Sequence, residues 1–112
     1  MDIQFYEKAI AFAKKYNVMI LHDNAYSDIV FGGKEGKSFL SYKGAMEVGI
    51  EFYSLSKSYN MTGMRISFAL GNKDVIQMFR KVRSQIDYGI FLPIQKAAVA
   101  ALTGPQDNVK EQ

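Results

Sequence analysis

The chain has 112 residues, of which 48% are hydrophobic and 13% aromatic, so it has enough apolar material for the core of one small domain. It has no cysteine, which excludes disulfides and cysteine nucleophiles and favours a cytoplasmic location. The single histidine excludes a multi-histidine metal site, and the net charge of +3 is scattered, which argues against a nucleic-acid partner. No apolar window approaches the roughly 20 residues that a membrane span needs, so we expect no membrane partner.

The first part of the chain predicts a helix, a strand and a long loop. Apolar residues recur at spacings of three and four over residues 3–16, which indicates an amphipathic helix. Residues 18–22, VMILH, form an apolar run typical of a strand buried on both faces of a parallel sheet. The polar, glycine-bearing residues 23–44 predict a long loop with a brief extended piece at 28–31. The expected buried stripe of the helix comprises Phe5, Ala9, Phe12, Ala13 and Tyr16.

The second part of the chain predicts two short strands followed by two helices. The strands are expected within residues 49–56 and 65–71, which are short and rich in residues that favour strands. Asn72 is a good helix cap before an apolar stripe that continues to residue 86, and Pro93 suits the first turn of a last helix. This alternation of helices and strands predicts an α/β fold. The expected core residues of the first of these strands are Ile50, Phe52 and Leu55.

Charged and hydroxyl side chains lie next to the predicted strand ends. Asp23 follows the first strand, Lys57 follows the second, and Arg65 lies where the third begins. Because open α/β sheets bind ligands beyond the carboxyl ends of their strands, we expect these charges to meet in one cleft. A lysine with a lowered pKa is a Schiff-base nucleophile, and Ser54, Ser56 and Arg65 supply donors suited to a phosphate. An acid, an amine and a phosphate cradle together describe a pocket for pyridoxal phosphate.

Three stretches of the sequence carry a resemblance to a known family. DNAY at 23–26, SLSKSYNMTGMR at 54–65 and NKDVIQMFRKVRSQID at 72–87 resemble the large domain of fold-type I, pyridoxal-phosphate-dependent aminotransferases of class I and II. The three stretches are most similar to the branch of LL-diaminopimelate and aspartate-type aminotransferases. The resemblance implies a partial three-layer α/β/α fold with mostly parallel strands flanked by helices. It also implies that residues 1–112 are a fragment of the cofactor-binding large domain.

The resemblance further implies a role for each candidate residue. Lys57 would form the internal aldimine with pyridoxal 5'-phosphate and then move a proton between the substrate α-carbon and the cofactor. Asp23 would pair with the pyridine nitrogen and keep it protonated, and Tyr26 would donate to the phenolic oxygen of the ring. The reaction would transfer an amino group between an amino acid and a 2-oxo acid, without a metal, in a homo-oligomer that is generally a dimer. The phosphate would be held by Ser54, Ser56 and Arg65.

Two other interpretations compete with the aminotransferase. Chains of the family are several times longer, so we expect residues 1–112 to lack the N-terminal part and the C-terminal small domain, and the isolated chain to be inactive. The alternative function is therefore a non-catalytic truncated fragment that retains the site residues and self-associates through exposed strand edges and apolar faces.

Tyr53 and Lys57 also have the Tyr-x-x-x-Lys spacing of short-chain dehydrogenases, but the chain has no G-x-G-x-x-G fingerprint for a dinucleotide.

Overall fold

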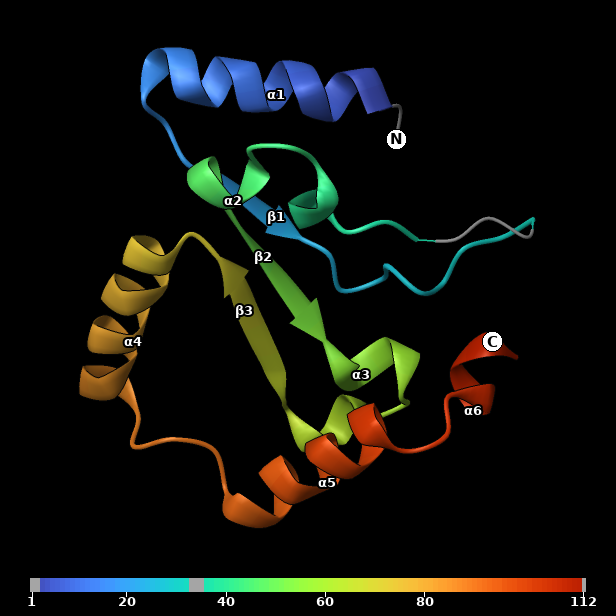
Figure 1. The fold of residues 1–112 in the computed structure, drawn as a ribbon. Coiled ribbons are helices and arrows are strands. Elements are labelled where there is room, and N and C mark those ends of the chain that lie inside the picture. The colour runs from blue at the N-terminus through green and yellow to red at the C-terminus, as the bar shows by residue number, and fades with distance from the viewer. Residues whose placement is uncertain (1–2, 33–35, 112) are drawn as a thin grey trace.

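The computed structural model describes residues 3–32 and 36–111, and its centre is a sheet of three strands (Figure 1). The strands are β1 (Ile20–Asp23), β2 (Gly49–Ser54) and β3 (Ser67–Gly71), in the order β1-β2-β3. β1 and β2 are parallel, whereas β2 and β3 are antiparallel. Two of the three strands therefore run in the same direction, and the predicted α/β fold is confirmed.

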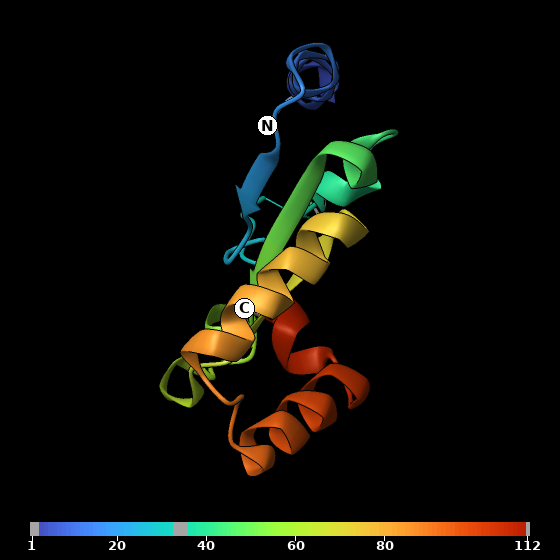
Figure 2. The same cartoon turned by 90° about the vertical axis from the view of Figure 1, so that its left-hand side faces the viewer.

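Helices lie around this sheet at both ends and beside β3. In Figure 1, α1 lies beyond the starts of β1 and β2, α4 runs beside β3, and α3 and α5 lie at the carboxyl end of β2. Figure 2 shows α1 end-on at the top of the molecule, well separated from α5. None of the helices in the described ranges is long and apolar enough to cross a membrane. The helices are α1 (Ile3–Tyr16), η1 (Phe39–Ser41), α2 (Ala45–Val48), α3 (Leu55–Ser58), η2 (Thr62–Met64), α4 (Lys73–Ile86), α5 (Leu92–Thr103) and α6 (Asp107–Lys110).

The three long helices begin and end close to where the sequence predicts. α1 has the predicted bounds, and α4 starts at the expected cap, where Asn72 Oδ1 accepts hydrogen bonds from the backbone nitrogens of Asp74 at 3.0 Å and Val75 at 3.2 Å. Pro93 lies in the first turn of α5, where its missing N–H costs no helical hydrogen bond. The sequence pattern does not predict the short helices, because a single turn has too few residues to establish a period.

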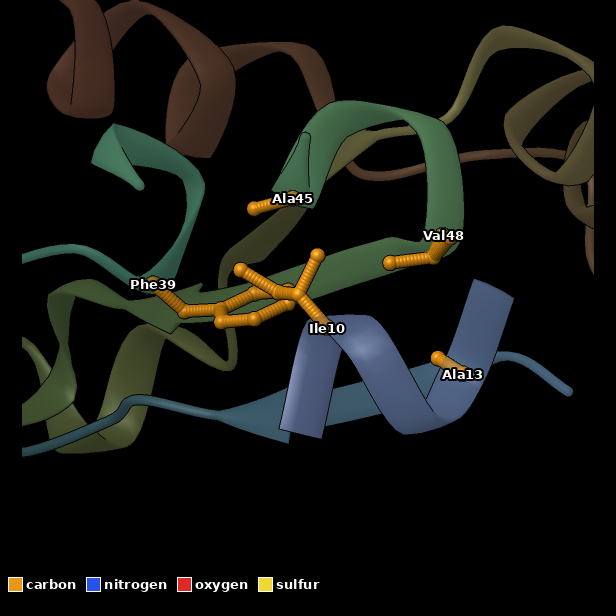
Figure 3. Close-up of a cluster of buried hydrophobic side chains, with 5 residues drawn as sticks. All are labelled: Ile10, Ala13, Phe39, Ala45 and Val48. Carbon is orange, nitrogen blue, oxygen red and sulfur yellow. The ribbon is translucent and has the colours of Figure 1, made fainter. Parts of the chain in front are cut away.

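One hydrophobic core joins α1 to the start of the sheet, and we call it the α1 core. Five buried residues from three helical segments form it, and Figure 3 shows them grouped over β1 and β2. The predicted stripe of α1 is largely wrong, because Phe5, Phe12 and Tyr16 are 54–57% exposed. α1 instead contacts the sheet with a narrower face around small Ala13 and Ile10. The residues of the α1 core are Ile10, Ala13, Phe39, Ala45 and Val48.

A second and smaller core, which we call the α5 core, lies at the opposite end of the sheet. It consists of Leu55 from α3, Ile66 just before β3, and Ala98 from α5, with partly buried aromatic residues around them. The predicted core positions Ile50 and Leu55 are buried, at 3% and 0% exposure. Phe52 is only half-buried.

The prediction that the first strand is buried on both faces is wrong. Val18 and Met19 lie outside the strand and are exposed, and Leu21 within it is 66% exposed. Side chains alternate between the faces of a strand, so Ile20 and His22 face the α1 core while Leu21 and Asp23 are exposed on the opposite face. Residues 28–31, where a brief extended piece was expected, form no strand.

Candidate functional site

Asp23 is the last residue of β1, and its side chain is exposed on the face of the sheet opposite the α1 core. The chain continues along β2 for one more residue, since the Asn24 nitrogen donates to the Phe52 carbonyl oxygen at 2.9 Å. Within residues 3–32 and 36–111, the Asp23 side chain has no hydrogen bond or ion pair. Its charge is therefore free to accept a donor from a ligand.

Lys57 lies in the single turn of α3 that follows β2. Ser54 caps this turn, because its Oγ accepts a hydrogen bond from the Ser56 nitrogen at 3.2 Å. The Lys57 side chain is half-buried, and its Nζ lies 5.4 Å from the centroid of the Tyr26 ring. A cation over an aromatic face is attracted to the ring quadrupole, so this contact holds the amine beside the loop that follows Asp23.

Arg65 lies in the segment between η2 and β3, and its backbone is left-handed, with φ of 52°. This conformation is uncommon for a residue with a Cβ and persists only where neighbouring contacts enforce it. Arg65 Nη1 donates to the Thr62 carbonyl oxygen at 3.0 Å, and Thr62 Oγ1 donates to the Ser56 carbonyl oxygen at 2.9 Å. The Leu55 nitrogen also donates to the Ile66 oxygen at 3.4 Å. These bonds place the turn carrying Arg65 directly against the turn carrying Ser56.

The topology brings all the candidate residues to one edge of the sheet. β1 and β2 are parallel, so their carboxyl ends meet at this edge, and antiparallel β3 begins there with Ser67 opposite Ser54. The edge presents a carboxylate, a primary amine, a phenol, two hydroxyls and a guanidinium, which is a donor set suited to a phosphorylated pyridine aldehyde. Two of the candidate side chains, Lys57 and Tyr26, contact each other directly. The six residues are Asp23, Tyr26, Ser54, Ser56, Lys57 and Arg65.

A groove of about 1030 Å³ lies elsewhere, between β3, α4 and α5. Its lining combines apolar residues of the α5 core with basic side chains of α4, and includes Ile66, Phe68, Arg80 and Tyr88. None of the six candidate residues lines it. Leu55 and Ser67 do line it, so the groove adjoins the edge at which the chemistry-bearing side chains gather.

Sequence reasoning missed a buried carboxylate next to this edge. Glu51, in the middle of β2, is only 6% exposed. Its Oε2 accepts hydrogen bonds from His22 Nδ1 at 3.0 Å and the Phe39 nitrogen at 2.7 Å, and its Oε1 accepts from Asn24 Nδ2 at 3.1 Å. A signal for it exists in the sequence, because a glutamate inside the apolar strand GIEFYS has to be paired if it is buried.

The hydrogen bonds to Glu51 outweigh the cost of its burial. Burial by itself raises the pKa of a carboxyl group, but bonds from Asn24, His22, Ser38 and the Phe39 backbone together hold the pKa of Glu51 below its ordinary value. The group is therefore an ionised, fully paired carboxylate at neutral pH. His22, which also lies 3.4 Å from the Tyr6 hydroxyl, is engaged in this structural network.

A second unpredicted contact ties the loop after β1 to β2. The Tyr53 hydroxyl bonds to the Asp28 carboxylate and lies 3.3 Å from Ser58 Oγ. Burial and the hydrogen bond to Asp28 raise the pKa of Tyr53 to about 12. Tyr26 lies in the same loop, two residues before Asp28, so this bond restrains the ring that contacts Lys57.

The α/β fold and the donor set at its sheet edge are those of a protein suited to binding a phosphorylated pyridine aldehyde. Comparison with known proteins identifies the family. The family model described as "Aminotransferase class I and II" matches residues 1–112, and the chain belongs to this family. The chain is 46% identical over 111 residues to the glutamate-pyruvate aminotransferase AlaC of Escherichia coli, a match that covers 99% of the chain and 27% of that protein. It is 51% identical over 107 residues to the LL-diaminopimelate aminotransferase of Syntrophobacter fumaroxidans, covering 96% of the chain and 28% of the relative.

Solved structures agree with this assignment. Substrate-bound BacF from Bacillus subtilis superimposes with a TM-score of 0.93 at 40% identity, over 99% of the chain and 28% of BacF. A probable N-succinyldiaminopimelate aminotransferase from Thermus thermophilus gives a TM-score of 0.92 at 36% identity, over 99% of the chain and 30% of that protein. The chain therefore has the fold of part of a fold-type I aminotransferase, and it spans less than a third of the length of these relatives. Enzymes of this family use pyridoxal 5'-phosphate to move amino groups between amino acids and 2-oxo acids.

Proposed function

We propose that residues 1–112 are the cofactor-binding part of the large domain of an aminotransferase that uses pyridoxal 5'-phosphate. The observation that carries this proposal is the placement of Lys57, a half-buried residue with its Nζ 5.4 Å from the centroid of the Tyr26 ring, at the sheet edge where the Asp23 carboxylate has no partner among the described residues. A primary amine can bond covalently to an aldehyde. The family membership supplies the identity of that aldehyde.

In this proposal each side chain has a separate task. Lys57 Nζ would hold the cofactor by condensing with its aldehyde, which releases water. Once the substrate amine displaces it, the free Lys57 amine would carry a proton to and from the substrate α-carbon. Asp23 holds a proton on the pyridine nitrogen through its carboxylate, and Tyr26 donates its hydroxyl hydrogen to the phenolic oxygen of the ring. When bound, the cofactor supplies an electron sink for the bonds broken at the substrate α-carbon. The phosphate is bound by the side chains of Ser54, Ser56 and Arg65.

The wider assignments follow from the same proposal. The substrates are an amino acid and a 2-oxo acid. The names of the relatives suggest LL-diaminopimelate, glutamate and pyruvate as the first to test. The relatives extend well beyond the segment that the chain matches. In this proposal, the corresponding parts of the enzyme complete the site and recognise the substrate. A homodimer and a cytoplasmic location stay predictions from the sequence.

A second function is favoured by the surface of the described residues. Large apolar side chains of α4, α5 and the segment between them are exposed, among them Ile86 at 73% and Phe91 at 71%. Exposed apolar surface of this extent promotes association. The alternative is therefore a non-catalytic fragment that retains the site residues and self-associates.

An absorbance titration with pyridoxal 5'-phosphate separates the two functions. The chain, a Lys57→Ala variant and a Lys43→Ala control are each titrated, reduced with borohydride and digested, and the labelled lysines are located by mass spectrometry. Lys43 is an exposed lysine away from the sheet edge, so its loss controls for nonspecific labelling. Saturable labelling that disappears only in Lys57→Ala supports the cofactor site. Labelling that is spread over many lysines and unchanged in Lys57→Ala supports the non-catalytic fragment.

A further inference from the structure

Glu51 lies beside Asp23 in the sheet but has its side chain on the opposite face. The register of the parallel pair places Glu51 opposite His22 and Phe52 opposite Asp23. Because side chains alternate along a strand, the carboxylates of Glu51 and Asp23 are on different faces of the sheet. Glu51 therefore acts on Asp23 only through the backbone.

The two residues that flank Asp23 both bond to Glu51. His22 Nδ1 donates to Oε2 at 3.0 Å, and Asn24 Nδ2 donates to Oε1 at 3.1 Å. The Asn24 nitrogen additionally bonds to the Phe52 oxygen at 2.9 Å, which extends the ladder past the end of β1. One carboxylate thus holds the residue before and the residue after Asp23, and it fixes the backbone from which the Asp23 side chain projects.

The same carboxylate closes the loop that carries Tyr26. Phe39 begins η1 at the far end of this loop, and its nitrogen donates to Glu51 Oε2 at 2.7 Å. Asn24 at the start of the loop and Phe39 at its end are therefore bonded to the same side chain. The loop is anchored at both ends by a residue of the neighbouring strand.

The burial of Glu51 makes this arrangement rigid. Glu51 is 6% exposed, so its donors cannot be replaced by bulk water without opening the α1 core. A buried polar group left without its partner costs far more than an exposed one, and a buried charge costs more still. His22, Asn24 and the Phe39 backbone are consequently held in one arrangement.

We propose that Glu51 is a positioning residue for Asp23: by bonding His22 and Asn24 across the β1–β2 pair, it aims the Asp23 carboxylate at the ring nitrogen of the cofactor. This inference rests on the proposed function for the identity of the ligand. The restraint of the backbone at residues 22–24 is independent of that function and is tested separately.

The first arm of the test measures amide hydrogen exchange in the chain without cofactor. Glu51→Gln keeps the shape of the side chain, but its amide NH₂ group faces Asn24 Nδ2 or His22 Nδ1 with a donor in place of an acceptor. Asn24→Ala removes one of the hydrogen bonds to Glu51 from a half-buried position. In both variants the amides of residues 22 and 24, which point toward β2 in the ladder, should exchange about tenfold faster or more, while those of α4 are unchanged. Glu47→Gln is the matched control, because Glu47 is an exposed glutamate that pairs with Lys14 at 2.7 Å.

The second arm measures affinity for two probes. Pyridoxal 5'-phosphate has a ring nitrogen for Asp23 to bind, whereas an analogue with carbon at that position does not. We expect Glu51→Gln and Asn24→Ala to weaken binding of the natural cofactor about tenfold and binding of the analogue by less than about twofold. In an Asp23→Asn background, Glu51→Gln should no longer change the affinity for the natural cofactor, because the Asp23 carboxylate through which Glu51 acts is absent.

The outcomes separate a positioning role from a purely structural one. Unchanged exchange at residues 22 and 24 in folded variants would overturn the proposal. An equal loss of affinity for the two probes would also overturn it, because it indicates a general structural role. If the unmodified chain binds neither probe saturably, the proposed cofactor function fails for this chain. The exchange arm then still decides whether Glu51 holds the backbone around Asp23.

Discussion

The two ends of the sheet differ in how firmly they are built. The α1 core brings together residues from α1, η1 and α2 over β1 and β2, and Phe39 at its centre is completely buried. The α5 core has three buried residues, lies beside an open groove, and receives no buried residue from α4. The candidate site lies at the second end, where the packing is sparser.

This difference indicates which contacts hold each half of the candidate site in place. Asp23 and Tyr26 are held from the well-packed end, through Glu51 and its bonds to Asn24 and Phe39. Lys57 and Arg65 belong to turns whose main support is a few hydrogen bonds and the small α5 core. The carboxylate half of the site is therefore pre-organised, and we expect the lysine half to gain most order from a bound ligand.

The largest effect is expected from emptying the α1 core. Phe39→Ala should lower the free energy of unfolding by about 3–5 kcal/mol, since it removes a fully buried ring and leaves a cavity. Urea denaturation followed by circular dichroism measures the change. Phe31→Ala is the control, because Phe31 is 87% exposed and its loss should cost no more than about 0.5 kcal/mol. Similar costs for the two variants would refute the location of this core.

Truncation in the α5 core should cost less. Leu55→Ala removes a fully buried side chain, but the adjoining groove lets its neighbours relax, so we expect about 2–3 kcal/mol. The same denaturation experiment applies, with Leu21→Ala as the control at an exposed strand position. A loss as large as that of Phe39→Ala would contradict the contrast between the two cores.

The cap of α4 should contribute a smaller amount. Asn72→Ala removes the two bonds to the first turn and a third from Nδ2 to the Glu47 carbonyl oxygen at 2.8 Å. We expect a loss of about 1 kcal/mol, because capping bonds are worth this much and the position is partly solvated. Gln77→Ala, at an exposed position within α4, should have almost no effect. Equal stabilities of these two variants would show that the cap is dispensable.

The last prediction concerns the titration of Tyr53, which affects stability only above about pH 10. Its pKa in the folded chain is about 12, above the ordinary value of 10.0, so the neutral phenol is favoured by folding. The resulting stability is fully present below pH 10 and is lost as the pH rises from there through about 12. Tyrosine absorbance near 295 nm, recorded for the chain and for Tyr53→Phe, isolates this group. Asp28→Asn should move the transition toward lower pH, and an unchanged transition would exclude the bond to Asp28 as a cause.

The sequence predicts the elements whose signal is local and periodic. The bounds of α1 and α4 agree with prediction, because each helix spans several turns and α4 begins at a recognisable cap. The edge that gathers Asp23, Lys57 and Arg65 could also be predicted, since strand ends in an α/β sheet converge. Their assigned chemistry stays a prediction that the labelling experiment tests.

The remaining features depend on contacts that no local pattern encodes. The face of α1 that is buried is set by the position of β1 and β2, so the outward placement of Phe12 could not be read from its spacing. Glu51 is an ordinary glutamate in sequence, and its partners lie at positions 22, 24 and 39. The exposure of Leu21 reflects its place on the edge strand, since on the same face Ile50 of β2 is buried and Phe52 packs against Phe79 of α4.

The hydrogen bonds of Glu51 also bear on the order in which the chain folds. They join residues separated by 12, 27 and 29 positions, so they require loops of different length to close. Loop closure becomes slower and entropically more costly as the loop lengthens. The contact with Phe39 should therefore form first, and β1 should dock afterwards onto a partly assembled β2. The strand that ends at Asp23 would then be a late addition in folding.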